Sequence, residues 1–352
     1  MSAQEPNQDP ARSVRNAGDQ TIANYADWMV TNAASHLLRT AKKSGITARL
    51  RERQHTLDEL CEQLKLDAET TALVLDCLIS IGFVEQYGDD FALARAGHLL
   101  CEHDMDLGDA IWESLPARLA NIDVAEVHQN DEMPQGPSSG SMATSNYRSR
   151  VASTQWIHTS AAMQAAEMLD DGTPVQSVLD VGCGAAVWSC AYCHRKPDVA
   201  TVVAVDEESV LPIARKTVES IELGSRYKWV TLEPREFAQA TLEDAPFDIA
   251  FLPQVLTGYS DSDAEKLLTA TRQSIRPGGK VVIPDAYVGP GGAGLDELTA
   301  RLVIRLLTNS GRVRDLKSFQ QMLVDSGFEK IQFSFLAASR GGLGIVVASV
   351  PE

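Results

Sequence analysis

The stretch VLDVGCGAA at residues 178–186 decides how this chain folds. Its first four residues are a short apolar run, typical of a buried strand, and a helical stretch follows the two glycines. Glycine lets the backbone approach a ligand closely, and the first turn of a helix offers free N–H groups. The stretch therefore predicts a strand–loop–helix unit with a ligand site at its loop.

Further apolar runs downstream alternate with helical stretches, one of which, over 264–275, is preceded by Ser262 and Glu265 as a predicted capping box. Such alternation predicts a mainly parallel sheet covered on both faces. The last two runs are joined by a short loop, which can only connect antiparallel neighbours. We therefore predict a doubly wound α/β domain whose sheet has one reversed strand at its far side. The predicted strands are 177–181, 201–205, 228–232, 247–252, 280–283, 330–336 and 343–350.

The first half of the chain reads as helices followed by a hairpin. Thr56 and Glu59 predict a capping box, and a second helix follows with its buried side predicted at Leu73, Val74, Cys77, Leu78 and Ile81. Residues 83–87 and 91–93 flank a Gly-Asp-Asp turn. This order predicts a winged-helix unit. We expect a disordered tail over 1–19, the winged-helix domain with linker helices over 20–165, and the α/β domain over 166–352.

Charge argues against nucleic acid as a partner. The formal net charge is −17, and the helix over 67–80 that would enter a groove carries Asp67, Glu69 and Asp76 but neither Lys nor Arg. An interaction module is therefore favoured over a DNA-binding regulator. The same charge disfavours anionic membrane surfaces, and no apolar run is long enough to span a bilayer. With no apolar signal region at the N-terminus, we expect a cytoplasmic protein with reduced cysteines.

Asp206 follows the second predicted strand, 22 residues after Gly184. A carboxylate there can accept two hydrogen bonds from a ribose diol. Val187 stands where a dinucleotide site needs its third glycine, and no Lys-Ser/Thr pair of a P-loop follows. Asp180 at the start of the loop repels phosphate and suits a ligand that bears cations. These features favour S-adenosylmethionine, which carries an ammonium and a sulfonium.

Residues 190–194, Cys-Ala-Tyr-Cys-His, match the motif that attaches haem covalently. They fall in the helix directly after the loop, where a haem would collide with the sheet. A zinc site with Cys183 is also disfavoured, because that cysteine sits inside the glycine turn. We expect core packing and no metal.

These motifs together resemble the class I S-adenosylmethionine-dependent O-methyltransferases of small molecules, which include the acetylserotonin- and hydroxyneurosporene-methylating enzymes. The resemblance covers about residues 20–352. It implies a Rossmann-like, seven-stranded methyltransferase sheet, parallel with one antiparallel strand, and a mostly helical winged-helix domain that forms a homodimer. It rests on residues 56–60, 75–84, 180–184, 206, 277–280, 311–314 and 326–328.

The resemblance also assigns cofactor-binding roles. Asp180, Gly182 and Gly184 match the loop that holds the methionine part, and Asp206, with Glu207 beside it, matches the ribose-binding acid. The family usually has Gly-Asp-Phe after the third strand. Arg235, Glu236 and Phe237 stand there, so Glu236 would reach the adenine amine with a longer side chain.

The catalytic motif departs from the family. Its Leu-His-Asp-Trp aligns with residues 256–259, so Thr257 stands in place of the histidine base. A threonine hydroxyl has no pKa suited to removing a proton near neutral pH. Asp285 matches the acid partner of that base. His158 is the replacement base that we consider, or else a packed interdomain residue.

Trp112, Trp156, Met163 and Tyr259 resemble residues that line the family's substrate pocket, and would suit a flat, apolar or aromatic metabolite. They could equally be interface core. Three hypotheses remain for the reaction: a carbon or nitrogen acceptor that needs no base, a different base, or a cofactor bound without methyl transfer.

Overall fold

The computed structural model describes residues 10–102, 107–120, 147–148, 151–152, 155–234, 236–240, 242–288, 294–308, 311–339 and 342–352. The chain divides into two compact units, 1–107 and 108–352. The sequence analysis set the boundary at 165/166, so residues 108–165 group here with the second unit. In the part of the chain that is described, no helix has the length and apolar character needed to cross a bilayer.

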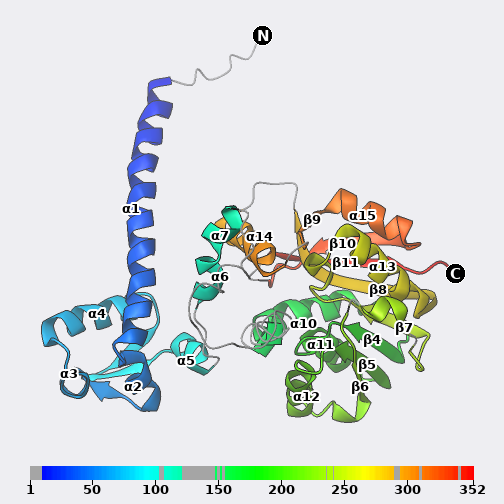
Figure 1. The fold of residues 1–352 in the computed structure, drawn as a ribbon, viewed down its shortest axis with the longest axis horizontal. Coiled ribbons are helices and arrows are strands. Elements are labelled where there is room, and N and C mark those ends of the chain that lie inside the picture. The colour runs from blue at the N-terminus through cyan, green and yellow to red at the C-terminus, as the bar shows by residue number, and fades with distance from the viewer. Residues whose placement is uncertain are drawn as a thin grey trace, which may run out of the picture. The chain divides into compact units, whose positions relative to one another are not determined.

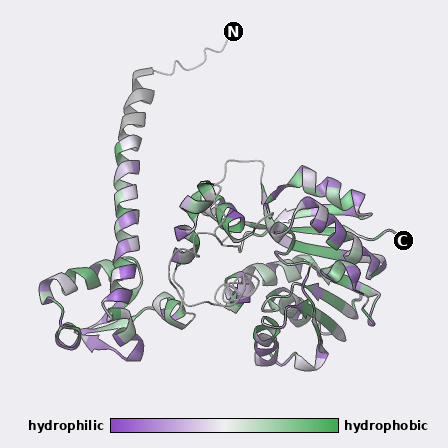
Figure 2. Ribbon diagram, in the orientation of Figure 1, coloured by the Kyte–Doolittle hydropathy of each residue, from purple (hydrophilic) through white to green (hydrophobic). Residues whose placement is uncertain are grey.

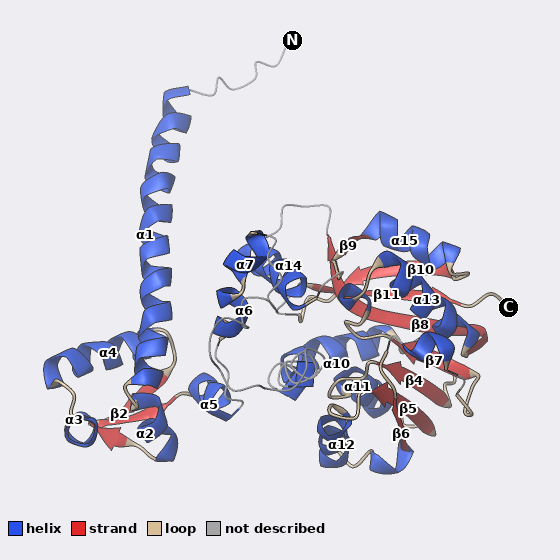
Figure 3. Ribbon diagram, viewed as in Figure 1, coloured by secondary structure: helices blue, strands red, loops and turns tan. Residues whose placement is uncertain are grey.

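The first unit is mostly helical with a small antiparallel sheet in the order β1-β3-β2, as expected of a winged helix (Figure 3). Thr56 Oγ1 accepts from the N–H of Glu59, and the Glu59 carboxylate accepts from the N–H of Thr56, so the predicted capping box is confirmed. The elements are α1 (Pro10–Lys43), α2 (Ile46–Glu52), β1 (His55–Thr56), α3 (Leu57–Leu64), α4 (Ala68–Ser80), β2 (Val84–Tyr87), β3 (Asp90–Leu93) and α5 (Arg95–Glu102).

Helix α1 begins at Pro10, inside the segment predicted as a disordered tail, while residues 1–9 lie outside the described part. The buried face of α4 agrees only in part with the predicted one. Leu78 is fully buried as predicted and Val74 packs partly against the core, whereas Leu73, Cys77 and Ile81 are exposed. Leu75, which was not predicted, is fully buried, so the buried face is rotated relative to the one that apolar periodicity indicated.

The second unit contains the predicted sheet, with strand order β10-β11-β8-β7-β4-β5-β6 (Figure 1). The strands from β8 to β6 are parallel, and β11 runs antiparallel to both β8 and β10, so the single reversed strand is confirmed. The strands are β4 (Ser177–Val181), β5 (Thr201–Asp206), β6 (Tyr227–Thr231), β7 (Phe247–Phe251), β8 (Ile275–Val288), β10 (Glu329–Phe335) and β11 (Leu343–Ser349), and β9 (Arg314–Asp315) pairs with the end of β8.

Helices cover both faces of this sheet. Alternate residues of β4 point to opposite sides, so Val178 joins the core under α10, α11 and α12, while Leu179 joins the core under α13 and α15. Figure 2 shows hydrophobic residues gathered on these strands. The remaining elements are α6 (Asp109–Glu113), α7 (Leu115–Leu119), η1 (Gln155–His158), α10 (Thr159–Met168), α11 (Val187–Arg195), α12 (Leu211–Ser220), η2 (Gly224–Arg226), η3 (Glu236–Gln239), η4 (Leu256–Gly258), α13 (Asp261–Gln273), α14 (Leu295–Leu307) and α15 (Leu316–Asp325).

Two boundaries differ from the sequence-based expectation. Strand β8 begins at Ile275 and not near Lys280, because a register shift against β7 carries the strand through the glycines that resemble a turn. Helix α13 begins at Asp261, where Ser260 Oγ accepts from the N–H of Asp263 at 3.2 Å. The capping box predicted at Ser262 is therefore wrong by two residues.

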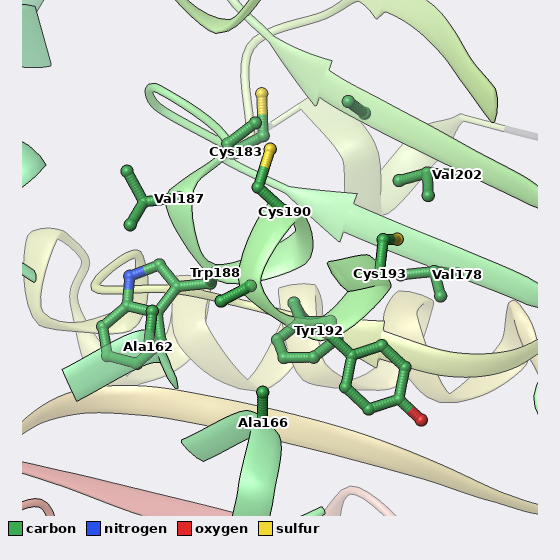
Figure 4. Packing of buried hydrophobic residues seen from close by; sticks show 14 of the residues in the cluster. Ala162, Ala166, Val178, Cys183, Val187, Trp188, Cys190, Tyr192, Cys193 and Val202 are labelled. Atoms are coloured by element: carbon green, nitrogen blue, oxygen red, sulfur yellow. The ribbon is translucent and has the colours of Figure 1, made fainter. Parts of the chain in front are cut away.

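Helix α11 is buried along nearly its whole length, and Trp188 packs beside Ala162 of α10 (Figure 4). Cys190 and Cys193 belong to this core, and burial raises the pKa of both thiols to about 12. His194, the last residue of the haem-like motif, is exposed. The cysteines therefore act as small apolar core residues.

Asp248 ties the beginnings of three neighbouring strands together. Its carboxylate accepts from the N–H groups of Gln176 and Ser177, at 2.7 and 2.9 Å, and from Nε of Arg276 at 2.5 Å.

We predict that Asp248→Ala lowers the free energy of unfolding by about 2 kcal/mol, because half-buried N–H groups lose their acceptor. Urea denaturation measures this loss. The matched control is Asp244→Ala, which removes an exposed ion pair with Lys228 and should cost less than about 0.5 kcal/mol. Equal losses of stability in the two variants would contradict the role of Asp248 in joining these three strands.

Candidate functional site

The loop between β4 and α11 is held in a conformation that favours glycine. Gly182 and Gly184 have φ of 68° and 56°, in the left-handed region. The N–H of Gly182 donates to the carbonyl of Val205 at 2.8 Å. A Cβ on Gly182 would lie 2.4 Å from Cγ2 of Val255, so the Val255 side chain packs too closely on this backbone for residue 182 to carry a side chain. The predicted glycine loop is therefore present after the first strand of the second unit.

Asp206, at the end of β5, is fully buried against this loop. Its Oδ2 accepts from the N–H of Gly184 at 2.8 Å and from the hydroxyl of Tyr147 at 3.2 Å, and its Oδ1 accepts from the N–H of Glu207 at 2.8 Å. Burial raises the pKa of Asp206 to about 6, although the N–H groups of Gly184 and Glu207 oppose that rise. The predicted ribose acceptor thus lies at the glycine loop, with Glu207 half-buried beside it.

Asp180 lies at the same edge of the sheet and is also fully buried. Its Oδ2 accepts from the hydroxyl of Ser189, while its Oδ1 is buried with no hydrogen-bond partner among the described residues. Burial raises the pKa of Asp180 to about 7, the Ser189 hydrogen bond opposes this, and the nearby charge of Asp206 adds to it. An unpartnered buried acceptor is costly, and it fits a ligand that brings a positively charged N–H donor.

Two side chains that the sequence analysis did not select cover the loop. The Gln155 amide lies 2.8 Å from the position of a Cβ on Gly184, and its Oε1 accepts weakly from the N–H of Ala185 at 3.4 Å. Tyr147 is the second, through its hydrogen bond to Asp206. Neither residue belongs to a recognisable motif, so only the tertiary structure could identify them.

The residues predicted near the adenine are less closely associated with the loop. Phe237 is buried in the core on the α13 side of the sheet, while Glu236 is exposed at the start of η3. Arg235 lies outside the described residues. The structure therefore groups Asp180, Gly182, Gly184 and Asp206 closely, and leaves Glu236 at the surface.

The structure brings Thr257 and Asp285 together in a buried contact. The Thr257 hydroxyl donates to Asp285 Oδ1 at 3.0 Å, and its N–H donates to Oδ2 at 3.3 Å. The N–H of Ala286 also donates to Oδ1 at 2.8 Å. Burial raises the pKa of Asp285 to about 6, and these three donors oppose the rise. Both carboxylate oxygens are therefore engaged with the protein, and Asp285 holds the η4 loop in place.

Arg314 also binds the η4 loop. Its guanidinium donates to the carbonyls of Leu256 and Tyr259, at 2.7 and 2.9 Å, and to Asp261 at 3.0 Å. Gly311 approaches so closely that a Cβ would lie 2.4 Å from the carbonyl oxygen of Thr257. The Gly-Arg-Val-Arg motif at 311–314 thus has a structural role that its sequence did not reveal.

His158, the replacement base considered above, ends η1 next to the loop-covering Gln155. Its ring stacks on Trp188, with centroids 6.3 Å apart and planes inclined by 25°. Burial lowers the pKa of His158. Its Nδ1 is buried without a hydrogen-bond partner among the described residues, so a neutral imidazole with a free ring nitrogen is favoured here.

The predicted substrate-pocket residues come from three parts of the second unit. Trp112 is on α6, Trp156 and Met163 are on η1 and α10, and Tyr259 follows η4. Trp156 and Met163 are 42% and 38% exposed, so neither is closed into a core. Tyr259 packs partly against the core on the α13 side, and Arg314 binds its carbonyl.

Burying a carboxyl that lacks a full set of donors should destabilise the protein near neutral pH. The folded Asp180 keeps its proton up to about pH 7, whereas the unfolded residue loses it near its ordinary pKa of 3.8. The free energy of unfolding should therefore fall as the pH rises between these values. We predict that Asp180→Asn raises stability at pH 8 by about 1–2 kcal/mol, measured by urea denaturation, and has little effect at pH 4.

The control for this change is Asp89→Asn, which makes the same substitution at an exposed turn and should alter stability by less than about 0.5 kcal/mol. An Asp180→Asn variant that is less stable than the native chain at pH 8 would contradict the cost assigned to this buried carboxyl.

Comparisons with known proteins agree with this architecture. A family model described as the O-methyltransferase domain matches residues 138–329, more than half of the chain. Acetylserotonin O-methyltransferase of Mus musculus is 29% identical over 107 residues, which are 28% of this chain and 28% of the mouse protein. The match thus spans under a third of that relative's length.

Solved structures match over nearly the whole chain. Human N-acetylserotonin methyltransferase in complex with S-adenosylmethionine has a TM-score of 0.69 at 16% identity, covering 99% of this chain and 100% of that one. Mitomycin 7-O-methyltransferase has a TM-score of 0.72 at 17% identity, covering 96% and 99%. At such identities the likeness establishes the fold. With the family match, it shows that this chain belongs to the family of S-adenosylmethionine-dependent O-methyltransferases.

Proposed function

We propose that this protein binds S-adenosylmethionine at the glycine loop and transfers its methyl group to a small apolar or aromatic metabolite. The observation that carries the proposal is Oδ1 of Asp180, which is buried beside a glycine-lined bend and has no hydrogen-bond partner among the residues that the structure describes. A cationic amino-acid group would satisfy this oxygen. The amino-acid part of S-adenosylmethionine supplies that group.

The other parts of the cofactor would find partners at the same edge of the sheet. Asp206 would accept from the ribose hydroxyls, with its carboxylate already oriented by the N–H groups of Gly184 and Glu207. The Tyr147 hydroxyl, which now occupies one of these acceptor sites, would have to yield or share it. Glu236 would need to turn inward to reach the adenine amine, and Phe237 would support the strand end from the core.

The sulfonium methyl is intrinsically reactive, so the chain's main contribution would be alignment of the acceptor with it. Thr257 cannot act as the base, because its hydroxyl donates to Asp285 and has no suitable pKa. Asp285 is itself engaged by three donors. The acceptor should therefore be a nucleophile that is already ionised or needs no deprotonation, or should give its proton to His158.

A second function is a homologue that binds the cofactor without methyl transfer. Two features support it: the family resemblance aligns Thr257 with the histidine position, and both carboxylate oxygens of Asp285 accept hydrogen bonds from the protein. Both functions require binding of the cofactor, but only the first includes transfer of its methyl group.

Calorimetry with S-adenosylmethionine and S-adenosylhomocysteine tests the binding, and mass-spectrometric screening of a metabolite extract tests the transfer. We predict that Asp206→Ala weakens binding at least about tenfold, because the ribose hydroxyls lose a buried acceptor. Asp198→Ala is the matched control, which makes the same substitution at an exposed turn before β5, at the opposite end of the strand, and should leave the affinity within about twofold. Unchanged affinity in Asp206→Ala would refute the placement of the nucleoside. Binding without any methylated product would support the second function.

A homodimer formed through the N-terminal unit is also proposed, as the family resemblance implies. Large apolar side chains lie exposed along α1, including Ile22, Tyr25 and Met29 at helical spacing, together with Trp28 and Val30. Such a contiguous exposed stripe is typical of an interface. A second copy of the chain would cover it.

We predict that a Trp28→Glu, Met29→Glu double variant is a monomer by light scattering at micromolar concentration, where the native chain is a dimer. Charges buried in an apolar interface are strongly unfavourable, which is the reason for the expected loss. Asp27→Lys, which changes the charge at an exposed position on the side of α1 opposite Tyr25 and Met29, should leave the mass unchanged. A monomeric native chain would overturn the proposal.

A further inference from the structure

A chain of buried hydrogen bonds links the start of β6 to the cofactor loop. The hydroxyl of Tyr227 donates to Ser189 Oγ at 3.1 Å, and the Ser189 hydroxyl donates to Oδ2 of Asp180. Tyr227 is 7% exposed, and the other two residues are fully buried. Ser189 also lies 3.4 Å from the carbonyl of Ala186, but a carboxylate is the stronger acceptor.

This chain of bonds engages Oδ2 of Asp180, while Oδ1 has no partner in the described part of the chain. A carboxylate with a single anchored oxygen keeps its second oxygen in a fixed place, provided that the surrounding core prevents rotation. That core is close-packed here, since Val178, Leu179 and Val181 on the same strand are all fully buried. The arrangement therefore presents Oδ1 as a pre-positioned acceptor.

We propose that Ser189 and Tyr227 are positioning residues, which hold Asp180 so that its Oδ1 receives the ammonium group of the cofactor's amino-acid part. The inference rests on the proposed cofactor site and assigns two further residues to it. Neither residue belongs to a motif that the sequence analysis selected. Ser189 acts through Asp180, and Tyr227 acts through Ser189.

Charge explains why the anchoring hydroxyl matters for binding. Burial raises the pKa of Asp180 to about 7, and the Ser189 hydrogen bond counteracts that rise by stabilising the ionised form. An ammonium group binds the ionised carboxylate, so affinity should increase with pH until Asp180 is ionised. Removing the Ser189 hydroxyl should shift the rise in affinity to higher pH.

Other titratable groups also face Asp180. Asp206 approaches from β5, Tyr227 from β6, Cys183 from the loop, and Cys190 and Cys193 from α11. Burial raises the pKa of the three thiols and of Tyr227, so all four stay neutral at pH 7. Asp206 ionises in the same range as Asp180, with a pKa of about 6, and its contribution must be separated by experiment.

Two ligands distinguish the contribution of Asp180 from that of Asp206. S-Adenosylhomocysteine carries the amino-acid group, while 5′-methylthioadenosine retains the adenosyl thioether and lacks that group. Calorimetry from pH 6 to 8.5 on the full chain should show that Ser189→Ala weakens S-adenosylhomocysteine about tenfold at pH 7 and moves the midpoint of the affinity profile upward. Tyr227→Phe should give a smaller loss, about threefold, in the same direction. Affinity for 5′-methylthioadenosine should change less than twofold in both variants.

Tyr192→Phe is the matched control, because it removes the same hydroxyl from a buried tyrosine of α11 that packs on Phe251. It should leave both ligands unaffected. Equal losses for the two ligands would reveal a general packing defect and overturn the positioning role, as would no loss for either. If Ser189→Ala does not fold, Tyr227→Phe alone decides by the same comparison. A native chain that binds neither ligand would contradict the proposed function, and this inference with it.

Discussion

The hydrogen bond from the N–H of Gly184 to the carboxylate of Asp206 joins the loop after β4 to the tip of β5. The loop can reach that carboxylate only because Gly182 and Gly184 adopt positive φ, and because Gly182 has no side chain to collide with Val255. Once the loop is fixed, α11 starts directly above the sheet, and its Ser189 reaches Asp180. The geometry of the proposed cofactor site therefore follows from this one contact.

Three carboxyl groups, Asp180, Asp206 and Asp285, are buried along the same edge of the sheet, and burial raises the pKa of each. Two of them are well supplied with donors, from the backbone, Tyr147 and Thr257. Among the residues that the structure describes, Asp180 has a single donor, on Oδ2, and its Oδ1 has none. Asp180 is therefore the carboxylate of these three that keeps an oxygen available for the charged group of the proposed cofactor.

Local sequence patterns were sufficient to predict much of the architecture. The apolar runs placed the strands within a few residues, and the short final loop predicted the reversed strand β11, because these signals depend on neighbouring residues only. Burial of α4 could not be predicted in this way, since Leu73 is apolar and still lies outside the unit's core. The glycine loop and Asp206 were found from their spacing. Tyr147, Gln155, Ser189 and Tyr227 were not, because their partners lie far along the chain and only tertiary packing brings them together.

The clamp on the η4 loop has a consequence for how this site can change over time. The Arg314 guanidinium donates to the carbonyls of Leu256 and Tyr259, on either side of Thr257, and Gly311 packs against the Thr257 backbone. The conformation of the loop therefore depends little on the side chain at position 257. The backbone of the η4 loop and the side chain at position 257 can thus change independently of each other. A lineage could exchange the side chain at this point, and with it the chemistry that the protein supports, while the surrounding scaffold stayed as it is.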